Sequence, residues 1–319
     1  MLRYLARSAV CRFDAVFLLA FIFAAVLATQ ATAGGPFVFR EERDYITLFE
    51  GDTPVFRYVR GEILPNGAPE DRRRSTYVHP LYSLDGRQLS EDGPRDHWHH
   101  RGMSWMWPKV TFDGITKDLW TLKGIRQHYE KHESQVYADR AVLTVANYWE
   151  EDSTKRRILD ETVTFIAYKA DTAGRIIDFE LRLSAKDVPV ALGTSARGYG
   201  GLQIRFGPRE DTIITTSKGK IDKDTDRLRL TWADLSARFN GSSEFDGVAI
   251  FDNKQNLHFP SGWTLRPYGV LNPAFTSTST DYTIEPEKPL TLRYRIYIHR
   301  GKADAERLNR MFDCYYRRG

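Results

Sequence analysis

The chain has 319 residues, of which 28% are charged and 13% aromatic, and its formal net charge is +4 at pH 7. The N-terminal segment, with three arginines and one aspartate in residues 1–33, supplies half of this surplus. The remaining chain is therefore close to balanced, and its scattered basic clusters do not indicate a nucleic-acid-binding surface. With Cys11 and Cys314 as its two cysteines, the chain cannot depend on a disulfide-rich scaffold.

An apolar run from Ala15 to Ala28 follows the N-terminal arginines and precedes Ala31-Thr32-Ala33. A basic start, an apolar core and a small-residue cleavage site are the three parts of a secretory signal peptide. The run is shorter than the roughly 20 residues that span a bilayer, and no later segment is apolar for long enough. We therefore predict a signal peptide over residues 1–33 and a periplasmic or secreted chain with no membrane span after cleavage.

Alternating apolar and polar residues dominate the rest of the chain, most clearly at Ile177–Ser184 and Leu290–His299. This period of two is typical of a strand with one buried face. A break at residues 170–174 between two such runs predicts a hairpin turn. Helical periodicity is confined to Lys302–Phe312. We predict a single all-β domain over residues 34–319, a large antiparallel β-sandwich with a short C-terminal helix.

The densest group of chemically capable residues comprises His79, His97, His99, His100 and Arg101. If the last four are extended, His97 and His99 share a face and could hold a metal ion. One histidine could instead act as a general acid or base, and Arg101 could clamp a carboxylate. A polar loop whose histidines bond to the backbone is the structural alternative.

Aromatic and polar residues on two neighbouring segments could complete such a site. Trp105 and Trp107 follow the histidines directly and are suited to stacking on sugar rings. Gln203 and Arg205 are two apart in an expected strand, so they share a face and could hydrogen-bond a sugar hydroxyl and a carboxylate. The alternative for this pair is the polar outer face of a strand.

Four segments carry a resemblance to a known family: Tyr77–Gly86, Asp96–Gly102, Gly200–Phe206 and Asn272-Pro273. They resemble the signature of an uncharacterised bacterial family called PmoA-like, or "methane oxygenase PmoA", in which a proline stands where this chain has Trp98. The resemblance implies a large β-sandwich of the galactose-mutarotase type, a supersandwich, and a place in exported glycan-degrading sets.

The oxygenase in that family name implies a membrane-spanning copper enzyme, for which the mature chain has no transmembrane segment. The mutarotase analogy implies two histidines and a carboxylate. The first histidine would be His97 or His100, but no histidine lies between His132 and His258 to serve as the second. The resemblance therefore predicts the fold better than it predicts the reaction.

We thus expect a carbohydrate-active enzyme, an epimerase, lyase or hydrolase, whose ligand is a sugar or a small molecule derived from a polysaccharide. A non-catalytic glycan-binding module is the alternative, and a metal-dependent oxidoreductase a further one. No cofactor is required by the sequence, although a metal at His97 and His99 is possible. The expected catalytic residues are His97, His99, His100 and Arg101, and the expected substrate-binding residues are His79, Trp105, Trp107, Gln203 and Arg205.

Overall fold

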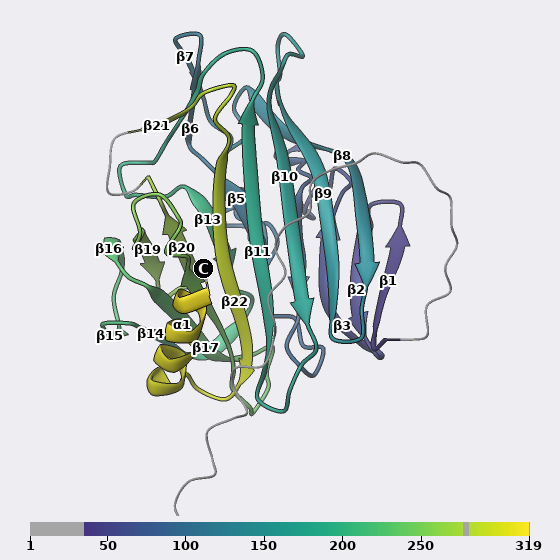
Figure 1. Cartoon of the computed structure of the whole chain (residues 1–319), viewed down its shortest axis with the longest axis vertical. Coiled ribbons are helices and arrows are strands. Elements are labelled where there is room, and N and C mark those ends of the chain that lie inside the picture. Colours follow the sequence, from purple (N-terminus) through teal and green to yellow (C-terminus); the bar gives the residue numbers. More distant parts are fainter. Residues whose placement is uncertain (1–34, 277–280, 319) are drawn as a thin grey trace, which may run out of the picture.

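Antiparallel strands make up nearly all the regular structure of the computed structural model, which describes residues 35–276 and 281–318 (Figure 1). The expected signal peptide, residues 1–33, lies outside the described residues. Two nine-stranded sheets contain most of the strands. Four shorter strands form a third, small sheet. The fold expected from the alternation, an all-β antiparallel sandwich, is confirmed.

The first sheet combines the first five strands of the chain with four later strands. In spatial order it consists of β1 (Phe37–Glu42), β2 (Tyr45–Glu50), β3 (Thr53–Val59), β4 (Tyr77–Leu81), β5 (Met103–Met106), β13 (Gly201–Arg205), β20 (Val270–Ala274), β19 (Gly262–Arg266) and β16 (Thr225–Arg229). The step from β5 to β13 brings together segments that are far apart in the sequence. A short 3-10 helix, Glu70–Arg72, lies between β3 and β4.

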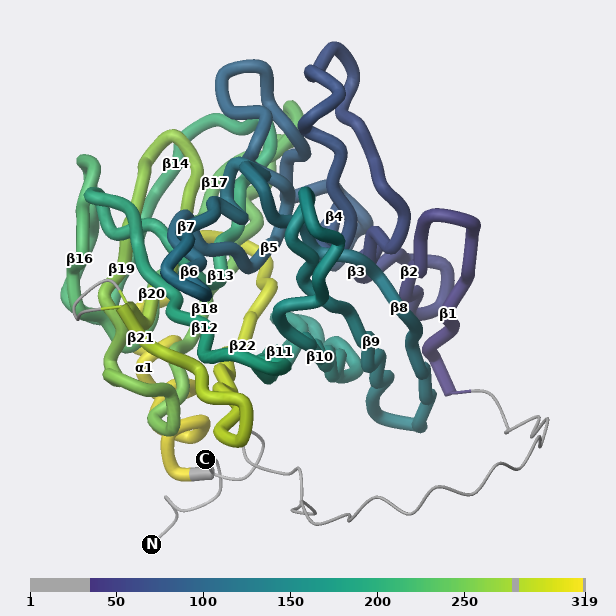
Figure 2. The backbone as a smooth tube through the Cα atoms, turned by 90° about the horizontal axis from the view of Figure 1, so that it is seen from above, coloured from purple at the N-terminus to yellow at the C-terminus, as the bar shows by residue number. Residues whose placement is uncertain are grey.

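The second sheet contains the long strands of the chain. In spatial order it consists of β15 (Gly219–Ile221), β14 (Arg209–Thr216), β17 (Trp232–Phe239), β18 (Asp246–Asp252), β22 (Leu290–Arg300), β11 (Gly174–Ala185), β10 (Arg157–Tyr168), β9 (Arg140–Glu151) and β8 (Ile125–Val136). The small sheet consists of β21 (Tyr282–Ile284), β12 (Val190–Gly193), β6 (Lys109–Phe112) and β7 (Ile115–Lys117). Seen from above, β8 lies beside β1 at one end of the sandwich (Figure 2).

The alternation in β11 shows why the long strands keep their register. Its apolar side chains are buried, whereas Asp178 and Glu180 point the other way. There Asp178 faces Arg295 of β22, with the Arg295 Nε to Asp178 Oδ1 distance at 2.6 Å, and Glu180 faces Arg293 at 2.7 Å. Opposite charges directly across a pair of strands contribute roughly 0.2–1 kcal/mol each. A one-residue slip would lose both pairs and expose the apolar face.

The core lies between the two large sheets and is rich in aromatic side chains. Trp105 of β5 is fully buried, with its ring centroid 6.1 Å from Phe165 of β10 and 5.2 Å from Phe179 of β11. Each large side chain removed from water in this way contributes roughly 1.5–3 kcal/mol. Contact of one strand of the first sheet with two of the second is direct evidence that the sheets pack face to face.

The helix α1 (Ala305–Arg318) covers an apolar area on the outer side of the second sheet (Figure 1). Leu308, Phe312 and Tyr315 pack against Trp232 and Phe251. The helix expected from the sequence, Lys302–Phe312, is therefore present but begins and ends later. Its start is fixed by a side-chain oxygen of Asp304, which accepts the backbone N–H of Arg307 at 3.1 Å and caps the first turn. None of the helices within residues 35–276 and 281–318 has the length and hydropathy needed to cross a membrane.

Candidate functional site

A row of buried polar side chains crosses four neighbouring strands of the first sheet. In register, Ser104 of β5 lies opposite Gln203 of β13, and Asn272 of β20 lies opposite Thr264 of β19. All four are at most 1% exposed. Since successive side chains of a strand point to opposite faces, these residues lie on the face turned away from Trp105 and the core. A polar row buried on the outer face of a sheet indicates that other parts of the chain cover it.

Arg205 lies on the same face, two residues after Gln203. Its Nε donates to Oε2 of Glu91 at 3.3 Å, and its Nη2 is 3.9 Å from Oδ1 of Asp96. The guanidinium carbon is 5.0 Å from the centre of the Tyr268 ring, within the range of a cation–π contact. The side chain is only 7% exposed, and Nη1 has no hydrogen-bond partner within the described part of the chain.

The histidine loop folds into two consecutive turns before β5, rather than the extended segment considered above. The backbone N–H of His97 bonds to the carbonyl of Pro94 at 2.8 Å, and that of His100 bonds to the carbonyl of His97 at 2.9 Å. These turns bring three imidazoles together, with centroids 4.9 Å apart for His97 and His100 and 4.6 Å apart for His99 and His100. Three of the expected catalytic residues therefore form one cluster.

Five ring side chains from four loops form a closed series of contacts that we call the aromatic collar. His97 stacks on Tyr268 at 5.8 Å, and the hydroxyl of Tyr268 hydrogen-bonds the hydroxyl of Tyr199 at 3.2 Å. Tyr199 contacts Trp120 at 5.3 Å, and Trp120 contacts His100 at 6.0 Å. The collar is completed by the contact of His100 with His97.

The collar lies on the polar face of the first sheet. Arg205 sits against Tyr268, and Arg266 of β19 sits against Tyr199 with its guanidinium carbon 5.0 Å from the ring centre. Both arginines belong to strands of the polar row. Loops that precede β5, β8, β13 and β20 therefore meet over the middle of this sheet, and they bury the polar row beneath rings.

Burial keeps the two inner histidines neutral. It lowers the pKa of His99 to about 4, helped by the charges of His97, Arg74 and Arg72. Burial also holds the pKa of His100 well below its usual range, and the neighbouring His99 and Arg205 act in the same direction. A neutral imidazole has one nitrogen that can accept a proton. His100 is 2% exposed, and its Nδ1 has no hydrogen-bond partner among the described residues.

The buried polar atoms without a hydrogen-bond partner among the described residues include three of this region: His100 Nδ1, Gln203 Oε1 and Arg205 Nη1. Nδ1 of His97 also belongs to that group, but it lies 2.9 Å from a carboxylate oxygen of Asp96. Nine in ten or more buried polar groups in proteins are paired with protein or water. Leaving one unpaired costs about 1–3 kcal/mol. Three such atoms on neighbouring segments point to a place where a polar ligand binds.

Arg101 differs from the other expected catalytic residues because its guanidinium is fully buried and already paired. Its Nε and Nη2 donate to the carboxylate of Asp92, Nη2 also donates to the Tyr77 hydroxyl and the carbonyl of Ile63, and Nη1 donates to the carbonyl of Arg72. This geometry favours a role in holding the loop in place over the expected role as a clamp on a ligand carboxylate.

The stacking role expected for Trp105 and Trp107 is incompatible with their positions. Both side chains are fully buried. Trp105 faces the sandwich core, and Trp107 packs between Trp149 and Phe275 at 5.8 and 6.2 Å. A sugar can stack only on an exposed ring face, so neither tryptophan offers a platform. Their place in the sequence, next to the histidines, gave no information about which face of the sheet they occupy.

His79, the fourth histidine of the expected group, lies on β4 and bonds elsewhere. Its Nδ1 is 3.0 Å from Oγ of Ser90, which also accepts the backbone N–H of Leu81 at 2.9 Å. Burial lowers the pKa of His79 to about 4. These contacts tie β4 to the loop before the histidine cluster, which supports a structural role.

Sequence reasoning missed three members of the aromatic collar: Trp120, Tyr199 and Tyr268. The available signal was their setting, because Tyr199 lies between two glycines and Tyr268 lies between a proline and a glycine. Aromatic residues in turns are not needed to fill a core. Only the fold brings the three loops together.

No metal centre can be assigned from the part of the chain that the structure describes. It contains no group of three or more His, Cys, Asp or Glu side chains arranged to hold a metal ion. The rings of His97 and His99 are 5.6 Å apart, and Nδ1 of His97 lies 2.9 Å from a carboxylate oxygen of Asp96. The pair that the sequence offered as a metal site is thus present without a third protein ligand.

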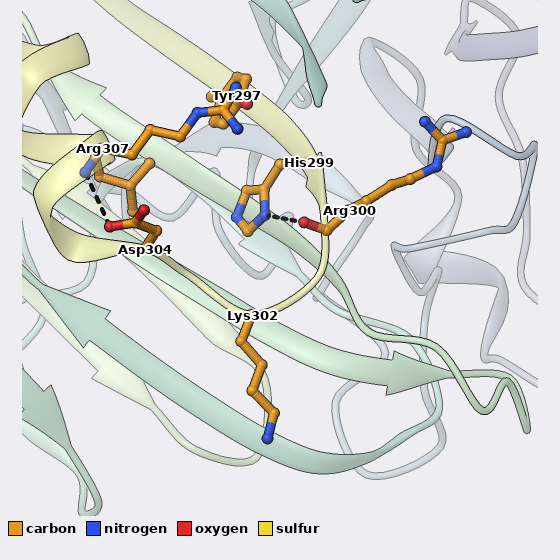
Figure 3. A pocket seen from close by; sticks show the side chains of 7 residues that line it. Tyr297, His299, Arg300, Lys302, Asp304 and Arg307 are labelled. Carbon is orange, nitrogen blue, oxygen red and sulfur yellow. Dashed lines mark hydrogen bonds between the residues drawn. The ribbon is translucent and has the colours of Figure 1, made fainter. Parts of the chain in front are cut away.

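A small hollow elsewhere on the surface has a second buried histidine in its wall (Figure 3). His299, at the end of β22, places Nε2 2.8 Å from Oδ2 of Asp234 and Nδ1 3.2 Å from the carbonyl oxygen of Arg300. Both partners are acceptors, so the charged imidazole, which carries hydrogen on both nitrogens, is the form that satisfies them. Burial alone would lower the pKa of His299, but the Asp234 carboxylate raises it above the ordinary value.

That second histidine fastens the chain before α1. Oδ1 of Asp234 accepts the hydroxyl of Ser236 at 2.6 Å, and the Ser236 oxygen accepts the backbone N–H of Ala303 at 3.0 Å. Every polar atom along this path has a partner. The arrangement explains a structural element, and the ring nitrogens of His299 are not free to bind a ligand.

Comparison with known proteins gives a family and two distant structures. Residues 45–313 match the family described as "Family of unknown function (DUF6807)". No curated protein sequence matches the chain. It is structurally similar to the GH36 α-galactosidase AgaA of Geobacillus stearothermophilus, crystallised with raffinose, at 12% identity and a TM-score of 0.43. The match covers 84% of this chain and 40% of the galactosidase.

The Slr1438 protein of Synechocystis is similar at 12% identity and a TM-score of 0.35, over 86% of this chain and 99% of that one. Likeness at these identities and TM-scores leaves the activity undetermined. The chain spans only 40% of the galactosidase's length, so a functional argument has to come from the site itself.

Proposed function

We propose that this chain, which belongs to the DUF6807 family of unknown function, is a carbohydrate-active enzyme whose site lies beneath the aromatic collar. One observation carries this proposal: three buried polar atoms, on His100, Gln203 and Arg205, have no hydrogen-bond partner in the described part of the chain and lie in the region of the aromatic collar. Sugars present hydroxyl edges to polar groups and C–H faces to rings. A few convergent polar groups among aromatic side chains are typical of a small-molecule site.

His100 supplies the chemistry in this proposal. Its neutral imidazole accepts a proton from a sugar hydroxyl or C–H onto Nδ1, and the imidazolium returns that proton to the ligand later in the cycle. The electron pair of the broken bond stays on the ligand, and no co-reactant is needed. This describes an epimerase or a lyase. Hydrolysis with two carboxylic acids is less favoured, because Glu91 and Asp96 are the nearby acids and both are ion-paired.

A glycan-binding module without turnover is the second candidate, and the aromatic collar favours it. Ring contacts hold sugars in binding proteins and in enzymes alike. The unpartnered nitrogen of His100 is a hydrogen-bond acceptor in a binding module and a proton acceptor in an enzyme, so turnover is what distinguishes the two.

The deciding experiment is a turnover screen over neutral and acidic oligosaccharides, with His100→Gln as the test variant and His128→Gln as its control. His128 is half-buried on β8, outside the collar. The enzyme proposal predicts that His100→Gln lowers turnover by about 10²–10⁴-fold. His128→Gln should keep the native turnover, and both variants should keep the native melting temperature. Sugar binding by the native protein without turnover of any member of the screen would favour the module.

Export and kinship with PmoA-like proteins complete the proposal and are supported by the sequence patterns described above. N-terminal sequencing of protein recovered from the periplasm or medium tests the export. A new N-terminus next to Ala33 is expected. Recovery of the full-length chain from the cytoplasm would contradict it.

A further inference from the structure

We infer that the ligand of this site carries a carboxylate that Arg205 binds, so that its substrate class is acidic sugars, such as uronic acid units. The inference rests on the proposed function and goes beyond it, because neutral sugars alone would satisfy that function.

Four arginines near the collar are buried, and two of them, Arg74 and Arg205, have a nitrogen without a hydrogen-bond partner among the described residues. Arg74 donates to the carbonyls of Leu119 and Trp120 through Nη2, whereas Arg205 donates to no backbone oxygen of the described chain. Arg101 holds the carboxylate of Asp92 and three backbone or hydroxyl oxygens. Arg266 donates to Oδ1 of Asp226 at 2.6 Å and to two carbonyls at 3.0 Å. Arg205 has one hydrogen bond to a side chain, at 3.3 Å from Nε, and its Nη1 has none in the described residues.

A buried guanidinium without full pairing is costly, because its charge has left water without gaining an equivalent partner. The planar fork of arginine matches a carboxylate with two parallel N–H···O bonds. Tyr268 lies against the guanidinium of Arg205 at 5.0 Å and limits its rotation. A ligand carboxylate is the group that satisfies both the charge and the free donor.

Nearby acids do not already fill this role. The side chain of Glu91 is 28% exposed and that of Asp96 is 62% exposed, whereas Arg205 is 7% exposed. Asp96 is 3.9 Å from the guanidinium, too far for a hydrogen bond, and 2.9 Å from His97. Both acids approach from the solvent side, where a ligand carboxylate can replace the weaker contact.

Gln203 extends the argument from one group to a sugar unit. Its Nε2 donates to Oγ of Ser104 at 3.1 Å, which leaves Oε1 as an acceptor for a hydroxyl. Two residues along a strand correspond to roughly 6–7 Å, a spacing comparable to the width of one sugar ring. A carboxylate at Arg205 and a hydroxyl at Gln203 fit opposite sides of one uronic acid unit.

Calorimetric titration of the purified protein tests the inference, with oligomers of galacturonate, glucuronate and mannuronate as probes and neutral oligomers of the same linkages as references. We expect acidic oligomers to bind at least tenfold more tightly than neutral ones. Arg205→Gln should weaken acidic binding on the order of ten- to hundredfold, the range of a hydrogen bond to a charged group. Arg205→Lys should retain part of the affinity.

Two further variants make the test independent of any folding defect. Arg238→Gln, which removes a partly exposed arginine paired with Asp211 on the second sheet, should leave all affinities unchanged. Glu91→Gln keeps Arg205 and removes its acidic partner, so acidic oligomers should bind more tightly. Equal binding of acidic and neutral oligomers, unaffected by Arg205→Gln while His100→Gln still stops turnover, overturns the inference and leaves the proposed function standing. Absence of both binding and turnover with every oligomer overturns both.

Discussion

His100 and His299 are buried to a similar degree, at 2% and 4% exposure, in different parts of the molecule. His100 precedes β5 of the first sheet, and its Nδ1 has no partner in the described chain. His299 ends β22 of the second sheet and uses both ring nitrogens, one on Asp234 and one on a carbonyl. Burial lowers the pKa of His100, whereas the Asp234 carboxylate outweighs burial and raises the pKa of His299.

The difference teaches how to separate a functional histidine from a structural one when both are hidden from solvent. A side chain that holds the fold together has its hydrogen bonds complete. A side chain retained for a ligand keeps a buried polar atom unpaired and lowers stability slightly in the free protein. The same contrast divides Arg205 from Arg101 and Arg266.

The largest expected effect on stability is at His299. His299→Ala leaves the Asp234 carboxylate buried without its cation, which should lower the free energy of unfolding by about 3–5 kcal/mol. His100→Gln removes no hydrogen bond of the described chain and should cost less than about 1 kcal/mol. Urea unfolding of both variants measures the difference, and similar losses would break the comparison.

The pH dependence of stability gives a second test of the comparison between His100 and His299. Because the folded-state pKa of His299 lies above the unfolded value of about 6.5, its contribution is fully present below that pH. The contribution is lost as the pH rises through the folded-state pKa. The stability difference between the native protein and His299→Gln should therefore shrink with rising pH, as urea unfolding at a series of pH values would show.

His100 supplies the control for that series. Its pKa is displaced downward, so it is already neutral throughout the range above pH 6.5. The difference between native protein and His100→Gln should stay constant above about pH 7.5, where the histidine is neutral in the unfolded chain as well. A difference that shrinks as much as that of His299→Gln would show that both histidines are charged in the fold.

A smaller effect is expected at Trp105, where structure and sequence interpretation disagree. Trp105→Phe removes part of a core side chain packed on Phe165 and Phe179 and should cost about 1–3 kcal/mol of stability. Affinity for any oligosaccharide that binds should not change, since the ring faces the core. A loss of affinity without a loss of stability, in calorimetric titration and thermal unfolding, would restore the stacking role.

The smallest effect belongs to the aromatic collar. Tyr199→Phe removes the hydroxyl that bonds Tyr268 at 3.2 Å in a solvent-exposed position, which should change stability by no more than about 0.5 kcal/mol. The association rate of a bound oligosaccharide, measured by stopped-flow fluorescence, should rise if this contact closes the collar. An unchanged rate would show that the collar opens elsewhere.

The long strands were predictable because their side chains alternate, as in β11 and β22, and a buried face leaves that pattern in the sequence. The short strands of the site leave a weaker one: β5 and β13 are buried on both faces, so Trp105 and Trp107 could not be assigned to the core. Of the expected site residues, His100, Gln203 and Arg205 lie in one region of the structure, and their roles there stay a prediction. Trp120, Tyr199 and Tyr268 depend on loops that only the folded sheet brings together.

Nuclear magnetic resonance of protein labelled with ¹⁵N in its histidines, recorded with and without acidic oligosaccharide, tests the central claim most directly. His299 serves as the internal reference, because it should show the shifts of a cation and should not respond to sugar. The account predicts that the nitrogens of His100 show a neutral ring in the free protein and move on addition of the ligand that binds. Movement of His299 alone, or a His100 signal that ignores a bound sugar, would contradict it.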